Sequence, residues 1–294
     1  MNKFLKRYSE FLDARKLEKV NLLKSVRVNT LKISEKELAK RLSAEGVQLE
    51  KVSFLDFGYL IKKSRFSLGS APEFLLGYYY VQEAASQLPV QALNPKENDT
   101  VLDMTASPGG KTTQIAQYMN NCGVLIALEK EKHRINALKN NIERMGIKNC
   151  IVYNTDAIDA GKLGIEFDKI LLDAPCSGSF LTDPKWFDKK SVEGFRERQE
   201  LQKKLLSAGI SVLKKNGTLV YSTCSLEPEE NEEVIDWAIA NLPIKLEKIE
   251  LKIGQPALQE FENKKFSKDV QKCIRIIPYD NNTQPFFIAK ISKK

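Results

Sequence analysis

Apolar runs alternate with helical segments from Thr100 to the end of the chain, and few folds accept such a pattern. Strands are expected at 101–104, 124–128, 150–153, 169–172 and 218–222, and helices at 112–119, 133–145, 200–213 and 231–240. Strands that alternate with helices form a parallel sheet with helices packed on both faces. Two later runs, 273–277 and 286–289, are joined by a short connection and predict an antiparallel pair. The sequence therefore predicts an α/β fold with a Rossmann-like sheet and an antiparallel C-terminal strand pair.

The first ninety residues lack the regular strand–helix alternation of the later part and predict a small α+β, RRM-like domain. Apolar side chains at roughly helical spacing over 1–24 predict an amphipathic surface helix. A strand is expected at 26–31, and Ser34 with Glu37 three residues later is typical of a helix start. Basic residues are scattered through this part: Arg27, Lys32, Lys51, Lys62, Lys63 and Arg65. They fit an RNA-binding domain and, about equally well, a solvated face on a docking domain. We therefore divide the chain into residues 1–90 and residues 91–294.

Composition narrows the class of protein and its partners. The 294 residues carry a net charge of +8, which suits a polyanion such as RNA and is also compatible with no partner. No apolar stretch approaches the ~18 residues of a membrane span, and the N-terminus lacks the apolar core of a signal peptide. We expect a cytoplasmic monomer with no membrane partner. The five cysteines form no CxxC pair and accompany a single histidine, so we expect reduced thiols and no metal site.

Two cysteines follow β-type runs in matching positions. Asp173-Ala-Pro-Cys176-Ser-Gly178 comes after the apolar run at 170–172, and Cys224 closes the run that begins at Thr218. In an open α/β sheet, ligands bind outside the carboxyl ends of the strands. If the two strands are parallel neighbours, both thiols face one pocket. A buried, inert cysteine is the commoner case for either residue alone, but the matched pair favours a site.

A glycine loop links the first strand of this unit to its first helix. It reads Asp103-Met-Thr-Ala-Ser-Pro-Gly109-Gly110-Lys111-Thr112, and its glycines let backbone amides approach a ligand. A P-loop NTPase would need glycine where Thr105 stands, and a dinucleotide enzyme would need G-x-G-x-x-G. The remaining nucleotide-type ligand is S-adenosylmethionine.

Acidic residues after successive strands favour this third ligand. Glu129 follows Gly110 by 19 residues, close to the ~20 expected for a carboxylate on ribose hydroxyls. Asp156 follows the third strand, where its side chain could meet the adenine. Each acid alone is more often a surface residue or a helix cap, but their recurrence indicates a nucleoside pocket.

Three motifs resemble those of the Nop/Sun/RsmB family of RNA cytosine-5 methyltransferases. They are the glycine loop, Asp173-Ala-Pro-Cys-Ser-Gly178 and Ser222-Thr-Cys-Ser225. Val26-Arg-Val-Asn-Thr-Leu-Lys32 and Gly77-Tyr-Tyr-Tyr-Val-Gln-Glu83 are also similar to the family, so the likeness runs from about Val26 to the C-terminus. The short layout is most similar to the archaeal tRNA enzymes of the family. The resemblance implies a class I methyltransferase sheet, S-adenosylmethionine as cofactor, and tRNA as substrate, with rRNA as the alternative.

The functional residues of the family carry over to matching positions. The cofactor loop corresponds to Thr105, Ala106, Ser107, Pro108, Gly109, Gly110 and Lys111. The rest of the cofactor site corresponds to Glu129, Arg134, Asp156 and Asp173, with Asp156 at the adenine and Asp173 beside the methyl and base pocket. Cys224 matches the nucleophile, and Cys176 matches the cysteine that assists product release.

Some positions depart from the family pattern. Thr105 and Ser107 stand where the family usually has Cys and Ala; both are small, so we expect cofactor binding to be kept. Ser179-Phe180 replaces a Gly-containing continuation, which bears on contacts to the target base.

The implied chemistry explains why two thiols are needed. Carbon-5 of cytosine is a weak nucleophile, and a thiolate that adds to carbon-6 pushes electron density onto it, which is covalent catalysis. Asp173 would offset the charge that develops on the ring. Lys111 or a helix N-terminus could lower the pKa of the nucleophilic thiol. The glutamates at 227, 229, 230, 232 and 233 are expected to stabilise the start of the next helix instead.

Other functions remain as alternatives at this stage. Methylation of an exocyclic amino group would need a Pro-Pro-aromatic motif, which Ala-Pro-Cys replaces. A P-loop NTPase would predict Mg²⁺-dependent ATP binding that is indifferent to Cys224. A non-catalytic RNA-binding protein would need neither cysteine.

Overall fold

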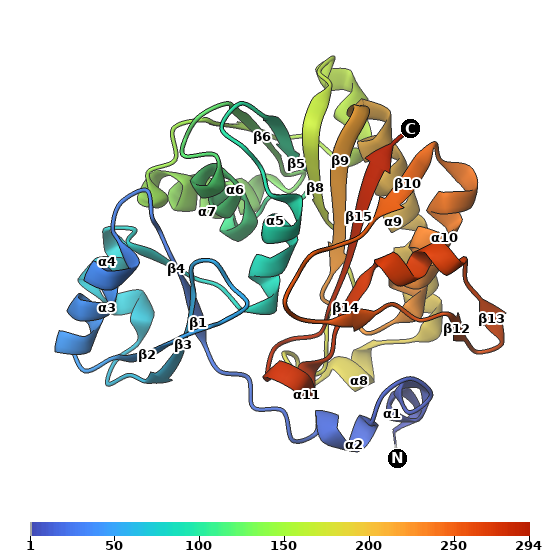
Figure 1. Cartoon of the computed structure of the whole chain (residues 1–294), viewed down its shortest axis with the longest axis horizontal. Helices are drawn as coiled ribbons and strands as arrows, with labels where there is room; N and C mark the ends of the chain where they lie inside the picture. The colour runs from blue at the N-terminus through green and yellow to red at the C-terminus, as the bar shows by residue number, and fades with distance from the viewer. Residues whose placement is uncertain (1) are drawn as a thin grey trace.

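The computed structural model describes residues 2–294, and its two larger sheets lie side by side (Figure 1). The smaller sheet and its helices come first in the chain: β1 (Ser25–Val28), α3 (Glu35–Ala44), β2 (Gln48–Lys51), β3 (Gly58–Lys63), α4 (Pro72–Leu75) and β4 (Tyr79–Val81). Its strand order is β2-β3-β1-β4, with every pair antiparallel. This βαββαβ arrangement agrees with the predicted RRM-like domain. Helix α3 begins where the sequence indicated, because the Ser34 hydroxyl accepts a hydrogen bond from the Glu37 amide at 3.2 Å.

The larger sheet follows the expected alternation. Its first half contains α5 (Leu88–Leu93), β5 (Thr100–Asp103), α6 (Gly110–Tyr118), β6 (Val124–Leu128), α7 (Lys132–Met145), β7 (Cys150–Tyr153) and β8 (Phe167–Asp173). Its second half contains α8 (Trp186–Lys189), α9 (Val192–Val212), β9 (Leu213–Thr223), α10 (Glu232–Asn241), β10 (Ile244–Glu247), β11 (Gln255–Pro256), β14 (Ile274–Ile276), α11 (Pro278–Asn281) and β15 (Phe286–Lys293). A separate small hairpin is formed by β12 (Glu260–Phe261) and β13 (Lys264–Lys265).

The larger sheet has the strand order β11-β14-β15-β9-β8-β5-β6-β7, and β10 pairs with β15. Strands β9, β8, β5, β6 and β7 are parallel neighbours, whereas β15 and β14 run antiparallel. The predicted Rossmann-like sheet and the antiparallel C-terminal pair are therefore confirmed. Helix α9 begins eight residues earlier than predicted, at Val192.

Helices cover both faces of this sheet, which explains why its strands are continuous apolar runs. Ile170 and Leu172 of β8 pack with side chains of α9 and α10 on one face. Leu171, between them, packs with α5 and α6 on the other. Successive residues of one strand thus enter two different cores.

The N-terminal segment differs from the single surface helix predicted over 1–24. It forms two short helices, α1 (Lys3–Tyr8) and α2 (Ala14–Leu17), and Asp13 caps the second by accepting a hydrogen bond from the Arg15 amide at 3.2 Å. Their apolar faces are buried against Trp186 and Phe195 of the larger unit, and Figure 1 shows both helices beneath it. Residue 1 lies outside the described part of the chain.

Arg27 also differs from its predicted place on a basic surface. Its side chain is fully buried, and its guanidinium donates to Gln117 Oε1 at 3.1 Å, to Thr113 Oγ1 at 2.8 Å and to the Gly110 carbonyl at 2.7 Å. Because these three acceptors belong to α6, Arg27 fastens the small sheet to that helix. Among residues 2–294, no helix has the length and apolar character that crossing a membrane requires.

Candidate active site

The two cysteines meet at the carboxyl ends of neighbouring parallel strands. Asp173, the last residue of β8, lies opposite Ser222 of β9 in the register of the sheet. Cys176 follows β8 by three residues and Cys224 follows β9 directly, so both side chains are delivered to one edge. Their sulfur atoms are 3.2 Å apart, close enough for one thiol to donate to the other. The predicted juxtaposition of the thiols is confirmed.

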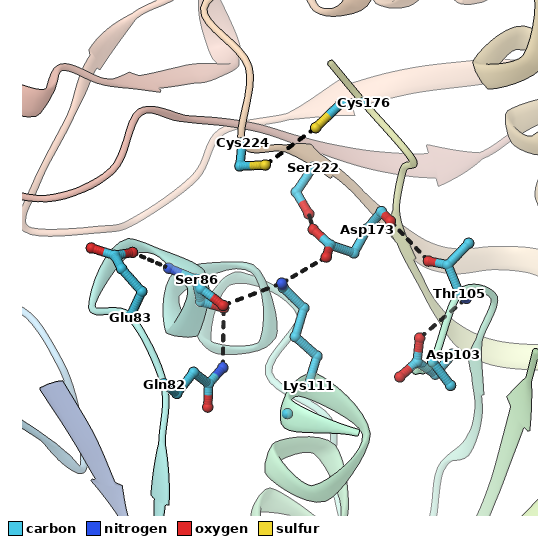
Figure 2. Close-up of polar contacts among 12 residues, drawn as sticks. Gln82, Glu83, Ser86, Asp103, Thr105, Lys111, Asp173, Cys176, Ser222 and Cys224 are labelled. Atoms are coloured by element: carbon cyan, nitrogen blue, oxygen red, sulfur yellow. Dashed lines mark hydrogen bonds and ion pairs between the residues drawn. The ribbon is translucent and has the colours of Figure 1, made fainter. Parts of the chain in front are cut away.

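Asp173 is held at three points below the thiols (Figure 2). Its Oδ2 accepts from Lys111 Nζ at 2.7 Å, and its Oδ1 accepts from Ser222 Oγ at 2.8 Å. Its backbone carbonyl accepts from Thr105 Oγ1 at 2.8 Å. The threonine that departs from the family pattern therefore has a structural role, since its hydroxyl fixes the glycine loop to the end of β8.

A cavity of about 320 Å³ opens beside these residues. Its walls include eight predicted site residues: Thr105, Ser107, Glu129, Arg134, Asp156, Asp173, Cys176 and Cys224. Leu128, Ala157, Pro175, Leu201 and Leu205 are among the residues that give it an apolar lining. The structure thus brings together the thiols and the acidic residues that follow successive strands.

The other residues of the glycine loop lie next to this cavity. Ala106, Pro108, Gly110 and Lys111 line a second cavity of about 210 Å³, which the first adjoins through Asp173, Thr105 and Ser107. Tyr80, Gln82, Glu83 and Ser86 form its opposite wall and come from the N-terminal part of the chain. Gly109 lines neither cavity. It precedes α6 with φ +105°, a conformation that L side chains rarely adopt, and so turns the chain into the helix.

The donors and acceptors around the larger cavity fit an adenosyl group with an attached amino acid. The Glu129 side chain is 4% exposed, and its Oε1 accepts from the Glu131 amide at 2.8 Å. Its Oε2 lies 3.6 Å from Arg134 Nη1, beyond hydrogen-bond distance, which leaves lone pairs for the two hydroxyls of a ribose. Apolar side chains beside Asp156 suit a purine face.

The two thiols have different acidities. The hydrogen bond from Cys176 lowers the pKa of the Cys224 thiol, and Lys111 lowers it further. Burial, Asp173 and Glu230 act in the opposite direction, but the net pKa shift of Cys224 is downward. The same hydrogen bond and then burial raise the pKa of Cys176 well above its ordinary value. Cys224 is therefore the more acidic thiol of the pair, and Cys176 keeps its proton more strongly.

Lys111 places a positive charge beside Asp173 and Cys224. Burial lowers the pKa of its ammonium, but the charge of Asp173 and the hydrogen bond with it more than offset burial, so the pKa is raised. Lys111 consequently stays charged under the thiol pair. The prediction that Lys111 lowers the pKa of the nucleophilic thiol agrees with this arrangement.

The glutamates after Cys224 do not all act as predicted. Glu232 and Glu233 lie in the first turn of α10, but Glu227, Glu229 and Glu230 are buried in other contacts. Glu230 accepts from the Ser177 amide at 3.0 Å and from Ser177 Oγ at 2.7 Å. It therefore braces the Cys176 loop rather than the helix. The sequence could not show this, because a contact across 53 positions leaves no local pattern.

Three hydroxyl side chains of the site were missed from the sequence. Ser222 holds Asp173, Ser177 binds Glu230, and Ser86 Oγ accepts from Lys111 Nζ at 3.3 Å. Ser222 had a detectable signal, since it lies two residues before Cys224 on a strand and must point to the same side of the sheet. Ser86 had none, because it comes from a different part of the chain.

Known families and proteins match nearly the whole chain. The model described as 16S rRNA methyltransferase RsmB/F matches residues 90–292, and the one for the N-terminal domain of 16S rRNA methyltransferase RsmF matches residues 1–84. The tRNA (cytosine(49)-C(5))-methyltransferase of Pyrococcus abyssi is 40% identical over 99% of this chain and 96% of its own length. A mouse 28S rRNA (cytosine-C(5))-methyltransferase is 37% identical over 97% of this chain, which spans 36% of that protein. The crystal structure of a methyltransferase homologue from Pyrococcus horikoshii matches with a TM-score of 0.90 and 42% identity, covering 99% of this chain and 94% of that one.

Proposed function

The chain belongs to the RsmB/F family of RNA cytosine-5 methyltransferases, and we propose that it methylates carbon-5 of a cytidine in tRNA with S-adenosylmethionine. The observation that carries this proposal is the pair of thiols 3.2 Å apart, set above the ion pair of Asp173 and Lys111. Family membership disfavours the P-loop NTPase and the non-catalytic RNA-binding protein. Methylation of an exocyclic amino group would leave the thiol pair without a purpose.

Residues around the larger cavity would hold the cofactor. Glu129 would accept from the ribose hydroxyls, with Arg134 beside it, and Asp156 would lie at the adenine. The glycine loop from Thr105 to Lys111 would carry the amino-acid end near the start of α6. When bound, the cofactor supplies a methyl group on a positively charged sulfur.

Cys224 would act as the nucleophile. Its thiolate sulfur forms a bond to carbon-6 of the cytosine, and the electron pair of the carbon-5–carbon-6 double bond moves to carbon-5. Carbon-5 then takes the methyl group. Loss of the carbon-5 proton to a base restores the double bond, and the carbon–sulfur bond breaks to return the thiolate.

Asp173 and Cys176 would assist at different stages. Asp173 is fixed by Lys111 and Ser222, so its carboxyl can share a proton with ring nitrogen-3 while charge develops on the ring. Cys176 lies against Cys224, and its pKa is raised, so it keeps its proton. Its thiol can therefore donate a hydrogen bond to the Cys224 thiolate as that thiolate leaves carbon-6.

Several features support tRNA as the substrate. The Pyrococcus abyssi relative is named for a tRNA position and has nearly the same length as this chain, whereas the mouse rRNA relative is far longer. The net charge of +8 suits any RNA. A target cytosine must leave its stack to reach the thiols, so a loop or flexible position is expected. A tRNA substrate also suits a cytoplasmic enzyme.

The N-terminal domain would contribute RNA contacts. We propose residues 1–90 and 91–294 as the two functional units, in line with family models that end at 84 and begin at 90. Lys63 and Arg65 have exposed side chains and are candidates for phosphate contacts. Arg27 is excluded from that role because it is buried.

The decisive test compares methyl transfer by the wild type, Cys224→Ala and Cys176→Ala with labelled S-adenosylmethionine. Bulk tRNA and rRNA are offered separately. We expect 5-methylcytidine in tRNA with the wild type, none with Cys224→Ala, and a covalent protein–RNA adduct with Cys176→Ala. Methylation by Cys224→Ala would refute the nucleophile assignment. Labelling of rRNA alone would refute tRNA as the substrate.

A further inference from the structure

The N-terminal helix α1 contacts the loops that carry both thiols. We propose that Arg7 and Tyr8 of α1 are positioning residues for the Cys176–Cys224 pair, acting through the glutamates that follow Cys224. This inference rests on the proposed function for its catalytic meaning, but the thiol geometry that it concerns can be measured without RNA or cofactor.

Arg7 is bound to three carboxylates. Its guanidinium donates to Glu227 Oε2 at 3.1 Å, to Glu229 Oε1 at 2.6 Å and to Glu262 Oε1 at 2.9 Å. The Arg7 side chain is 12% exposed, while those of Glu227 and Glu229 are 0% and 6% exposed. The hydroxyl of Tyr8 donates to the other oxygen of Glu227. One carboxylate of the loop after Cys224 is thus held from both sides by consecutive residues of α1.

The glutamate loop passes this constraint to both thiols. The Glu227 amide donates to Ser225 Oγ at 3.1 Å, and Ser225 follows Cys224 directly. Glu230, at the end of the 3₁₀ turn Pro228–Glu230, binds Ser177, which follows Cys176. The hydroxyls of Ser177 and Ser225 lie 3.1 Å apart and join the two loops. A displacement of Glu227 would therefore move one thiol relative to the other.

An aromatic contact supports the Cys176 loop from the same helix. The ring of Phe4 lies 5.1 Å from that of Trp186 in an edge-to-face arrangement, and Tyr8 stacks on Phe180 with ring centres 6.3 Å apart. Trp186 Nε1 donates to the Ser177 carbonyl at 2.9 Å. Helix α1 therefore reaches both loops, one through carboxylates and the other through an indole.

The chemistry of these contacts favours positioning over simple stabilisation. A buried ion pair is a weak source of stability, because desolvation of the charges cancels most of their attraction. The apolar residues of α1 would dock the helix without Arg7. Directional hydrogen bonds to two carboxylates instead fix the place and the rotation of a loop, which a thiol pair with one productive geometry requires.

Loosening this clamp should change the acidity of Cys224. The charged or titratable groups that influence Cys224 are Cys176, Asp173, Lys111 and Glu230. Of these influences on the pKa of Cys224, the hydrogen bond with Cys176 is the largest, and it exists only while the two loops hold the sulfur atoms together. If the sulfur atoms separate, the Cys224 thiolate loses its hydrogen-bond donor and the pKa of Cys224 rises. The acid limb of its pH–rate profile, which is the range where the rate increases as the thiol ionises, then moves to higher pH.

The experiment measures alkylation of Cys224 by iodoacetamide against pH, resolved by peptide mass spectrometry. The variants are Arg7→Met, Arg7→Lys and Tyr8→Phe, and single-turnover methyl transfer is measured in parallel. For Arg7→Met we expect the acid limb to rise by about half a pH unit, which is about a threefold loss of thiolate near neutral pH. Arg7→Lys should restore most of the wild-type profile. Exposed Cys122 serves as the internal control in each sample.

The matched control is Arg15→Met, an arginine of the same segment whose side chain is 87% exposed and pairs with Asp13. It should leave the Cys224 profile unchanged. An unchanged Cys224 profile in Tyr8→Phe and in every folded Arg7 variant overturns the inference. Tyr8→Phe keeps the ring packing, so it carries the test if Arg7→Met does not fold. If the wild type methylates no RNA but the profile shifts, the proposed function fails and the positioning role stands.

Discussion

Removing the sulfur of Cys176 should make Cys224 a weaker acid. In Cys176→Ala the donor 3.2 Å from Cys224 is lost, while the burial and the carboxylates Asp173 and Glu230 that raise the pKa of Cys224 remain. A hydrogen bond to a charged group contributes about 1.5–3 kcal/mol, and a thiol is a weak donor, so the lower end applies. Since 1.36 kcal/mol corresponds to one pKa unit, we expect a rise of about one unit.

The assay is the rate of Cys224 alkylation between about pH 6 and 10, because the thiolate is the reactive form. The variant should have an acid limb displaced to higher pH and about tenfold less thiolate near neutrality. Cys122→Ala is the control, since Cys122 is exposed and is not among the residues lining the cavity. The covalent RNA adduct of Cys176→Ala should form more slowly at pH 7 than at pH 9 for the same reason.

An unchanged or lowered acid limb in Cys176→Ala would refute this reasoning. It would mean that Cys224 owes its acidity to Lys111 rather than to its neighbour, or that the neighbour holds the thiolate instead. Retention of the wild-type profile together with accumulation of the adduct would separate the two roles of Cys176. Product release would then need the second thiol, and thiol activation would not.

Two further perturbations test other parts of the site. Lys111→Met leaves the Asp173 carboxylate without its cation and should lower the free energy of unfolding, measured in urea, by about 1–3 kcal/mol. The loss is smaller than for a fully buried pair because the Asp173 side chain is 30% exposed. A double variant that adds Asp173→Asn should recover most of the lost stability. Glu129→Ala should weaken S-adenosylhomocysteine binding by about 10–100-fold in calorimetry, because charge-assisted hydrogen bonds contribute about 1.5–3 kcal/mol, and equal affinities would contradict the ribose role.

Local patterns were sufficient to predict the sheet and the thiol pair. The run 170–172 of β8 is continuously apolar because successive residues, such as Leu171 and Leu172, enter cores on opposite faces. Residues that follow such strands must gather at one edge, which is why Cys176, Cys224 and Asp173 could be predicted to meet. Helix α7 ends at Met145 as predicted, because Gly146 follows it with a φ of +73°, which suits glycine.

Contacts between distant segments could not be predicted in this way. The spacing of Phe4, Tyr8 and Leu17 indicated an apolar face but not the surface that it covers, which is the aromatic cluster around Trp186. Arg27 was assigned to a basic surface because charge suggests exposure, although its acceptors on α6 lie about ninety positions away. In both cases the partner is set by the docking of two folded units, and the sequence has no period that records it.

The register of β8 against β9 determines the chemistry more than any single side chain does. Asp173 and Ser222 are opposite each other in this register, so the carboxyl receives its hydroxyl donor and both cysteine loops start from the same level of the sheet. A slip by one residue would turn Ser222 to the other face and carry Cys224 away from Cys176. Register is fixed by the apolar residues on both faces, but the loops beyond the strands are not. The glutamates after Cys224 bind both Arg7 of α1 and Ser177 beside Cys176, so in our proposal a segment at the start of the chain supplies the missing constraint on Cys224.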